Sequence, residues 1–219
     1  GCAGVTSTSD AVSTEPALSS VTQAATVVLE NEYVRVTRVS LAAGSSLPTH
    51  AGERRAIYAL SDYLVTRADT GVTEETRRWS AGQVHFHDAG EHSLTNAGET
   101  DAVFLIVERL GGALPSDAVG PVSDAAIDSP ATTELLAEND TFRVLRVALA
   151  PGQAQPVHGG RARVIYSLSD YEIEWREVGE PEKSRNWSQG DVHWHLSGEH
   201  AARNVGNTVA SWLIVSLKE

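Results

Sequence analysis

The chain has no methionine, one cysteine and two lysines among its 219 residues. The lone cysteine, Cys2, rules out an intrachain disulfide and a thiolate metal cluster. With 29 acidic side chains against 17 basic ones, the formal charge of −12 disfavours contact with phosphate backbones, so no nucleic-acid partner is expected. Lys183 and Lys218 form no polybasic run for anionic lipid, and no apolar run reaches the length of a membrane span.

The start of the chain is poor in side chains that a core could bury. Residues 1–24 are mostly small and polar, which predicts a flexible tether. Gly1-Cys2 at its head resembles the mature start of a bacterial lipoprotein, where a cysteine after a small residue is diacylated. The lack of methionine indicates a processed or trimmed chain. Two interpretations stay open: a lipid on Cys2, with a periplasmic or cell-envelope location, or an arbitrary cut.

What the chain does contain is an internal duplication. Aligned without a gap, residues 27–110 and 135–218 are identical at 38 of 84 positions. Every histidine belongs to one of two sets of four that are 108 residues apart: His50, His85, His87 and His92, then His158, His193, His195 and His200. The most chemically versatile side chain stands only at repeated positions, which predicts two sites with imidazole chemistry.

The repeats also set the expected domain boundaries. These are a tether at 1–24, a first domain at 25–110, a linker at 111–133 and a second domain at 134–219. Inside each repeat, runs such as YVRVTRVSL and FRVLRVAL alternate with a period of two and end in Gly/Pro turns. No segment has a sustained helical period, so we predict an all-β fold with little helix.

Two motifs in each repeat resemble those of the cupin superfamily. The first opens as Gly44-x5-His50 and Gly152-x5-His158. The second, one residue short before its histidine, reads Gly82…Gly90-Glu91-His92-x3-Asn96 and Gly190…Gly198-Glu199-His200-x3-Asn204. The resemblance covers nearly all of both repeats. It implies two tandem cupin-type double-stranded β-helix (jelly-roll) barrels, that is, a bicupin.

The first motif departs from the family pattern. In that pattern both histidines of H-x-H, a following glutamate and the second-motif histidine hold a metal. Here Gly52 and Gly160 stand at the second histidine. The glutamate positions carry Ala56 or Ile57 in one repeat, and Val164 or Ile165 in the other. Two of the four implied ligands are therefore missing in each half, which taken alone indicates barrels without a metal.

A second pair of histidines could replace the missing ligands. His85 and His87 share one side of a strand, with Cα atoms about 6.6 Å apart. The resemblance puts their strand, and His50 and His92, at the barrel interior. We therefore predict an all-histidine site for one divalent transition metal (Fe, Zn, Ni, Cu or Mn) in each barrel. The ligands would be His50, His87 and His92, with His85 optional, and His158, His195 and His200, with His193 optional.

Two other interpretations of the histidines stay open. One is a hydrogen-bonded cluster that holds no metal. In the other the H-x-H pairs face outward, because Val84 and Phe86, or Val192 and Trp194, are better core residues than histidine.

Five further pairs of side chains recur, and three of them are candidates for the site. Glu91 and Glu199 are candidates for a general base or a partner of the adjacent histidine, although a turn role is favoured. Tyr58 and Tyr166 could reach the pocket, although half-buried strand positions are favoured. Arg55 and Arg163 could bind an acidic substrate bidentately, with pairing to Asp62 and Asp170, or to another local carboxylate, as the default. Asn96 and Asn204 are assigned to turns, and Trp79 and Trp187 to the core.

The histidine sets and the resemblance together favour a metal-binding bicupin that acts on a small molecule. If it is an enzyme, an oxygenase type is implied. The alternative is a non-catalytic module that holds a small polar ligand, which the lost glutamate favours. In a third interpretation one barrel is active and the other structural, because Asp88 aligns with Leu196 beside the sites. A homo-oligomer is compatible with all three.

Overall fold

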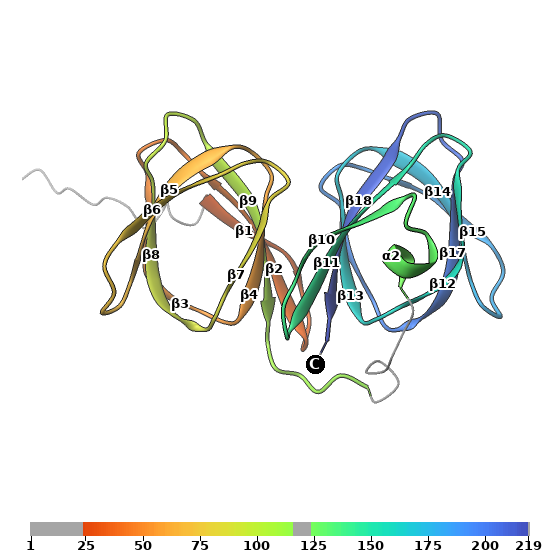
Figure 1. Cartoon of the computed structure of the whole chain (residues 1–219), viewed down its shortest axis with the longest axis horizontal. Helices are drawn as coiled ribbons and strands as arrows, with labels where there is room; N and C mark the ends of the chain where they lie inside the picture. Colours follow the sequence, from red (N-terminus) through yellow and green to blue (C-terminus); the bar gives the residue numbers. More distant parts are fainter. Residues whose placement is uncertain (1–23, 116–123, 219) are drawn as a thin grey trace, which may run out of the picture.

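The computed structural model describes residues 24–115 and 124–218, which form two β-barrels side by side (Figure 1). This confirms the predicted all-β fold of two tandem jelly-roll barrels. The predicted tether, apart from Ala24, lies outside the described residues, and so does Cys2. In the described part of the chain, no helix is long and apolar enough to cross a bilayer.

Each barrel consists of a five-stranded and a four-stranded antiparallel sheet. In the N-terminal barrel the orders are β1-β2-β9-β4-β7 and β3-β8-β5-β6. Its strands are β1 (Ala25–Glu30), β2 (Val34–Leu41), β3 (Ser46–Gly52), β4 (Arg55–Ala59), β5 (Tyr63–Asp69), β6 (Glu75–Trp79), β7 (Val84–His87), β8 (Gly90–Asn96) and β9 (Ala102–Arg109).

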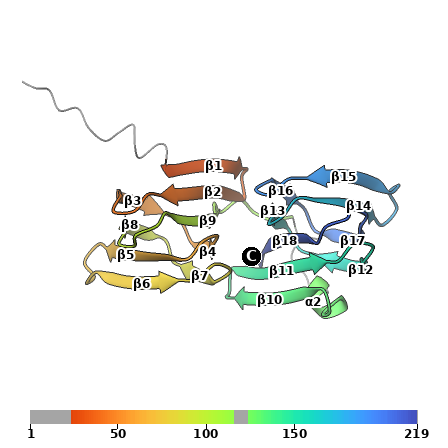
Figure 2. The same ribbon diagram turned by 90° about the horizontal axis from the view of Figure 1, so that it is seen from above.

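The C-terminal barrel repeats this plan, with sheet orders β10-β11-β18-β13-β16 and β12-β17-β14-β15. Its strands are β10 (Thr133–Glu138), β11 (Phe142–Leu149), β12 (Ala154–Gly160), β13 (Arg163–Ser167), β14 (Tyr171–Glu177), β15 (Lys183–Trp187), β16 (Val192–His195), β17 (Gly198–Asn204) and β18 (Ala210–Leu217). Seen from above, the first strand of each barrel lies beside the edge strand of the other, β1 by β16 and β10 by β7 (Figure 2).

The five-stranded sheets are buried on both faces because alternate side chains point to opposite sides of a strand. In β2, Val34 and Val36 pack into a core shared by the two barrels, whereas Val39 and Leu41 pack inside their own barrel. Between the barrels, Phe86 stacks on Phe142 with ring centroids 6.2 Å apart. The two cupin-like units therefore share one apolar interface.

Tyr58 and Tyr166 are buried in this shared core, at 7% and 3% exposure. They follow the sheet alternation and point away from the barrel interiors. Neither tyrosine lines the histidine-lined cavity of its barrel. The option that these phenols reach a pocket is therefore wrong for both repeats.

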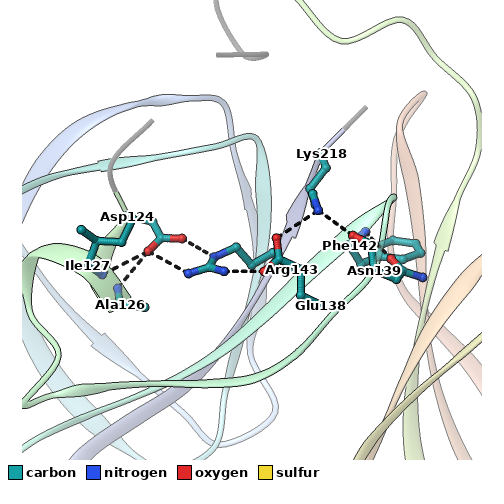
Figure 3. Close-up of polar contacts among 8 residues, drawn as sticks. All are labelled: Asp124, Ala126, Ile127, Glu138, Asn139, Phe142, Arg143 and Lys218. Carbon is teal, nitrogen blue, oxygen red and sulfur yellow. Dashed lines mark hydrogen bonds and ion pairs between the residues drawn. The ribbon is translucent and has the colours of Figure 1, made fainter. Parts of the chain in front are cut away.

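The connection between the barrels contains one helical turn that the sequence did not predict, α2 (Ala125–Asp128). Asp124 caps it by accepting hydrogen bonds from the backbone N–H groups of Ala126 and Ile127. The Asp124 carboxylate also binds the guanidinium of Arg143, which in turn binds Glu138, itself paired with Lys218 (Figure 3).

This network fixes the end of the connection to the C-terminal barrel. The last residues of the predicted linker (111–133) therefore pack on that barrel, because α2 contacts β10 and β12. Thr133 already belongs to β10.

Candidate functional site

The histidines of each H-x-H strand lie at the wall of a cavity inside their barrel. His85 and His87 have ring centroids 5.0 Å apart, and those of His193 and His195 are 4.8 Å apart. The residues between them, Phe86 and Trp194, stack on aromatic rings in the core shared by the barrels. The alternative of outward-facing histidines is therefore wrong. The sheet is covered on both faces, so the histidines line the cavity on one face while Phe86 and Trp194 pack between the barrels on the other.

The other two histidines of each barrel face each other across two strands. His50 on β3 pairs with His92 on β8, and their ring centroids are 4.3 Å apart. In the C-terminal barrel, His158 and His200 have the same separation of 4.3 Å. Four histidines thus line each cavity, and the structure shows which of their rings are in contact.

A backbone carbonyl sets the orientation of the first-motif ring in both barrels. The Nδ1 atom of His50 is 2.8 Å from the Pro48 carbonyl oxygen, and that of His158 is 2.8 Å from the Pro156 oxygen. A neutral imidazole that donates from Nδ1 keeps a lone pair on Nε2. The repeated prolines therefore carry the carbonyls that leave Nε2 free to accept a hydrogen bond.

A buried arginine lies beside the second-motif histidine. Arg55 is 1% exposed and Arg163 5% exposed. In the C-terminal barrel, Nη1 of Arg163 donates to the backbone oxygens of Arg161 and Leu196 at 2.9 and 3.2 Å, and Nη2 lies 3.4 Å from Nδ1 of His200. Arg55 has the same contacts in the N-terminal barrel, including Nη2 at 3.2 Å from Nδ1 of His92.

Neither buried guanidinium has a carboxylate as an ion-pair partner among residues 24–115 and 124–218. The predicted partners bind elsewhere: Asp62 accepts from the Ala81 N–H at 2.8 Å, and Asp170 from the Gln189 N–H at 2.7 Å. The default pairing of the arginines with these aspartates is therefore wrong. Carboxylates attract these groups only without a direct ion pair: Glu177, which lines the same cavity, acts on Arg163, and Glu108 and Asp69 act on Arg55. A buried charge without a direct ion-pair partner is costly, which makes it a candidate for function.

Burial keeps the imidazoles neutral. Desolvation, with a further contribution from Arg163, lowers the pKa of His200 to about 2 and that of His195 to about 4. Burial and then the charge of His195 lower the pKa of His193 to about 3. Desolvation also lowers the pKa of Arg163, to about 10, so the guanidinium stays charged at neutral pH. The wall of this cavity thus combines neutral rings with the buried guanidinium of Arg163 and the exposed one of Arg185.

The two cavities differ greatly in size. The C-terminal cavity has a volume of about 680 Å³, and the N-terminal one about 120 Å³. Ligand pockets commonly measure about 300–1,000 Å³, a range that includes only the larger one. Beside its histidines and Arg163, the C-terminal cavity is lined by Trp175, Trp187 and Trp212.

The sequence did not identify this aromatic wall. Trp187, predicted as core, stacks on His193 with ring centroids 4.0 Å apart, and Trp79 stacks on His85 at 3.8 Å. Trp175 has Arg67 as its counterpart. The sequence prediction of the site used only residues that are identical in the two repeats. The difference between Arg67 and Trp175 could have indicated that the two cavities have different walls.

The two recurring glutamates lie outside the buried part of the site. Glu199 is exposed at the wall of the C-terminal cavity, and Glu91 is exposed and does not line the N-terminal one. Asn96 and Asn204 have the predicted turn role, since each amide donates to two backbone oxygens.

Comparison with known proteins shows similarity at the level of structure. No family model and no curated protein matches the sequence. AerE from Microcystis aeruginosa is 16% identical, with a TM-score of 0.62 over 89% of this chain and 97% of that chain. A Lactobacillus farciminis oxalate decarboxylase formate complex is 14% identical, with a TM-score of 0.60 over 86% and 78%. A cupin 2 conserved barrel domain protein from Leptotrichia buccalis is 13% identical, with a TM-score of 0.52 over 89% and 88%. The fold is that of a cupin, present twice.

The side chains of this protein do not fit the metal site that the cupin pattern implies. A Cβ atom on Gly52 would lie 2.5 Å from Nη1 of Arg55, and one on Gly160 2.4 Å from Nη1 of Arg163. The guanidinium thus occupies the space beside the position of the missing histidine. Across the described part of the bicupin, no three His, Cys, Asp or Glu side chains are grouped to hold an ion. A fixed cation beside the imidazoles suits an anion better than a second cation.

Proposed function

We propose that the bicupin is a small-molecule-binding protein whose C-terminal barrel binds an organic carboxylate on Arg163. The observation that carries this proposal is a 5% exposed guanidinium without a carboxylate partner in the described chain, at the wall of a cavity of about 680 Å³. An anion placed there would neutralise the charge in a medium of low dielectric constant, where the attraction is strong.

The remaining hydrogen-bonding capacity of the site agrees with a carboxylate. A guanidinium has five N–H donors, and Nη1 of Arg163 already binds two backbone oxygens, which fixes the plane of the group. Nδ1 of His193 is buried without a hydrogen-bond partner in the described structure, as is Nδ1 of His85 in the other barrel. A bound molecule with polar atoms would satisfy such a nitrogen, which otherwise costs free energy.

The structural relatives support this ligand class. The Lactobacillus farciminis oxalate decarboxylase acts on one carboxylate and was crystallised with another, formate. A cupin barrel can therefore accommodate small carboxylates. In this chain the buried cation of the site would be Arg163.

The proposal is tested by calorimetric titration of the full chain with benzoate and with its neutral analogue benzamide. We expect benzoate to bind, and benzamide to bind at least tenfold more weakly. Arg163→Met should abolish the preference, whereas Arg146→Met, which removes an exposed arginine of the same barrel, should leave it unchanged. Equal binding of the two probes to the unaltered protein would refute the role of the charge.

A divalent metal on the histidines is a second candidate function, and it would require the rings to move together, since no three of them are grouped to hold an ion in the described residues. The observation that favours it is the set of neutral rings, with the Nε2 lone pairs of His50 and His158 left free. A Bacillus subtilis oxalate decarboxylase of similar fold has Mn(II) centres. Elemental analysis of the untagged protein separates the candidates: two equivalents per chain would favour the all-histidine sites, and one equivalent a single active barrel. No metal after reconstitution near neutral pH would leave the carboxylate site.

A further inference from the structure

We propose that three residue pairs, which differ between the repeats, sort ligands by size. Leu47, Arg67 and Leu94 restrict the N-terminal barrel to anions of a few atoms. Their counterparts, Gln155, Trp175 and Ala202, open the C-terminal barrel to a carboxylate with an aromatic body. This inference rests on the proposed carboxylate function and adds the ligand's size and shape.

The first pair differs in where its side chain goes. Leu47 is 7% exposed and packs with the apolar residues inside the N-terminal barrel. Gln155, at 2% exposure, donates from Nε2 to Oγ1 of Thr132 at 3.0 Å and to Oγ1 of Thr133 at 2.9 Å. The amide is therefore held by the segment after α2, and β12 contributes less apolar volume to the cavity than β3 does.

The second pair differs in volume. Leu94 on β8 packs against the apolar cluster inside the N-terminal barrel, opposite Arg67 in the strand register. Its counterpart Ala202 on β17 lies opposite Trp175 and is 8% exposed. Replacing leucine by alanine removes three carbon atoms from the wall, which leaves space next to the indole of Trp175.

The third pair differs in polarity. Arg67 lines the N-terminal cavity and is paired with Asp69, and its charge helps to depress the pKa of His85 and His92. Trp175 gives the C-terminal cavity an apolar wall at the same place. The N-terminal cavity is therefore lined by Arg67 besides Arg55 and Arg77, which suits a compact anion. The C-terminal cavity has only the counterparts Arg163 and Arg185, with an aromatic surface in place of Arg67.

The mouth of the larger cavity continues this difference. Val178 and Leu196 line it while 60% and 52% exposed, and their counterparts are Thr70 and Asp88. The guanidinium of Arg163 lies near this mouth, since it donates to the backbone oxygen of Leu196 at 3.2 Å, and the exposed Glu177 and Glu199 also line the cavity. A molecule whose carboxylate stays beside Arg163 while its apolar body packs on Trp175 matches this lining. The occupant that fits is thus an arylcarboxylate or a similarly flat apolar acid.

The experiment measures affinity and stoichiometry with three probes of increasing size: acetate, benzoate and 1-naphthoate. The unaltered chain should bind one naphthoate. Ala202→Leu should lower naphthoate affinity at least tenfold and acetate affinity less than twofold. The reciprocal Leu94→Ala should leave naphthoate binding by the C-terminal barrel unchanged. Ala202→Val, a smaller change, replaces Ala202→Leu if that variant does not fold.

A gain of function completes the test. A triple variant should raise the naphthoate stoichiometry from one to two per chain; it combines Leu47→Gln, Arg67→Trp and Leu94→Ala. If this variant does not fold, the double variant Arg67→Trp/Leu94→Ala replaces it. Two bound naphthoates in the unaltered chain would overturn the inference, and so would an equal loss of acetate and naphthoate in Ala202→Leu.

The same data separate this inference from the proposed function. If benzamide binds as well as benzoate and Ala202→Leu weakens the binding of both, Arg163 does not select the carboxylate, but the selection of ligands by size (the size rule) is supported. If Arg163→Met abolishes benzoate binding while Ala202→Leu leaves naphthoate unchanged, the proposed function stands and the size rule is wrong.

Discussion

The two barrels share their polar groups but not their cavities. Both have four histidines and a buried arginine at equivalent positions, with matching contacts from Arg55 to His92 and from Arg163 to His200. Yet one cavity measures about 680 Å³ and the other about 120 Å³. Under the proposed function, the polar groups set the sign of the charge that a barrel accepts, whereas the apolar lining sets how much of a ligand fits.

The largest expected effect is the loss of stability in acid, which both barrels share down to about pH 4 and in which they differ below it. Burial lowers the pKa of His85 and His92 to about 4, and of His193 and His200 to about 3 and 2. Because the folded-state pKa values lie below that of an unfolded histidine, the unfolded chain takes up protons first. Stability is therefore lost as the pH falls below about 6.5, by up to about 2 kcal/mol per ring at pH 5.

Urea unfolding between pH 7.5 and 3.5 measures this loss. We expect the free energy of unfolding to fall by several kcal/mol in total. Either double variant, His85→Gln/His92→Gln or His193→Gln/His200→Gln, should reduce the dependence of this free energy on pH between pH 6.5 and 5. Below about pH 4 only the second pair should still reduce it, because only those rings remain unprotonated. A free energy of unfolding that is constant from pH 7 to 5 would show that the rings take up protons without cost.

The shared core gives the next largest effect. Phe142 is fully buried and stacks on Phe86 across the interface, and its counterpart is the smaller Val34. Phe142→Ala should cost about 3–5 kcal/mol, and Val34→Ala about 2 kcal/mol, because a larger side chain leaves a larger cavity.

Urea titration with circular dichroism, read in both near- and far-ultraviolet, tests the shared core. A single transition in all variants is expected, because the interface couples the barrels. Two separated transitions in the unaltered protein would show that the barrels unfold independently.

How far the sequence predicts this molecule depends on the kind of residue. Period-two runs and the repeat predicted the barrels, because a strand displays its two faces in alternation. The same rule placed His85 and His87 on one face but could not say that both faces of the sheet are buried. Tyr58 was therefore assigned as a pocket candidate although it packs between the barrels.

The partners of the arginines could not be predicted from spacing. Asp62 is seven residues from Arg55, yet its carboxylate binds a turn N–H group, and the guanidinium binds backbone oxygens on distant segments. The four-residue helix α2 was likewise too short to show a helical period. Trp175 was overlooked because identity between the repeats was taken as the sign of function.

A methyl group at the glycine beside the arginine tests how the site is packed. Gly160→Ala places a Cβ within 2.4 Å of Nη1 of Arg163, so the guanidinium must move. We expect benzoate binding to weaken about tenfold and stability to fall by about 1–3 kcal/mol, as for other overpacked sites.

Gly198→Ala is the control, since nothing lies within 4 Å of its Cβ position in the same barrel. Calorimetry and urea unfolding provide both measurements. If Gly160→Ala binds benzoate normally, the guanidinium does not need its present position.

The smallest expected difference concerns a pair of surface arginines. Arg143 is 16% exposed and binds Asp124 and Glu138, whereas its counterpart Arg35 is 40% exposed and binds Glu30. Arg143→Ala should cost about 1–2 kcal/mol, because it leaves a part-buried carboxylate that also caps α2 without its cation. Arg35→Ala should cost less than about 0.5 kcal/mol, because water and salt screen an exposed pair.

Thermal melts at low and high salt separate these cases. High salt should reduce the difference in melting temperature between Arg35→Ala and the unaltered chain. It should leave most of the decrease in melting temperature that Arg143→Ala causes. Equal costs in both variants would mean that the segment carrying α2 gains no stability from Arg143. Thr132 and Thr133, which accept the hydrogen bonds of Gln155, would then be positioned by the barrel itself. This is possible because β10 begins at Thr133, independently of the Asp124–Arg143 ion pair.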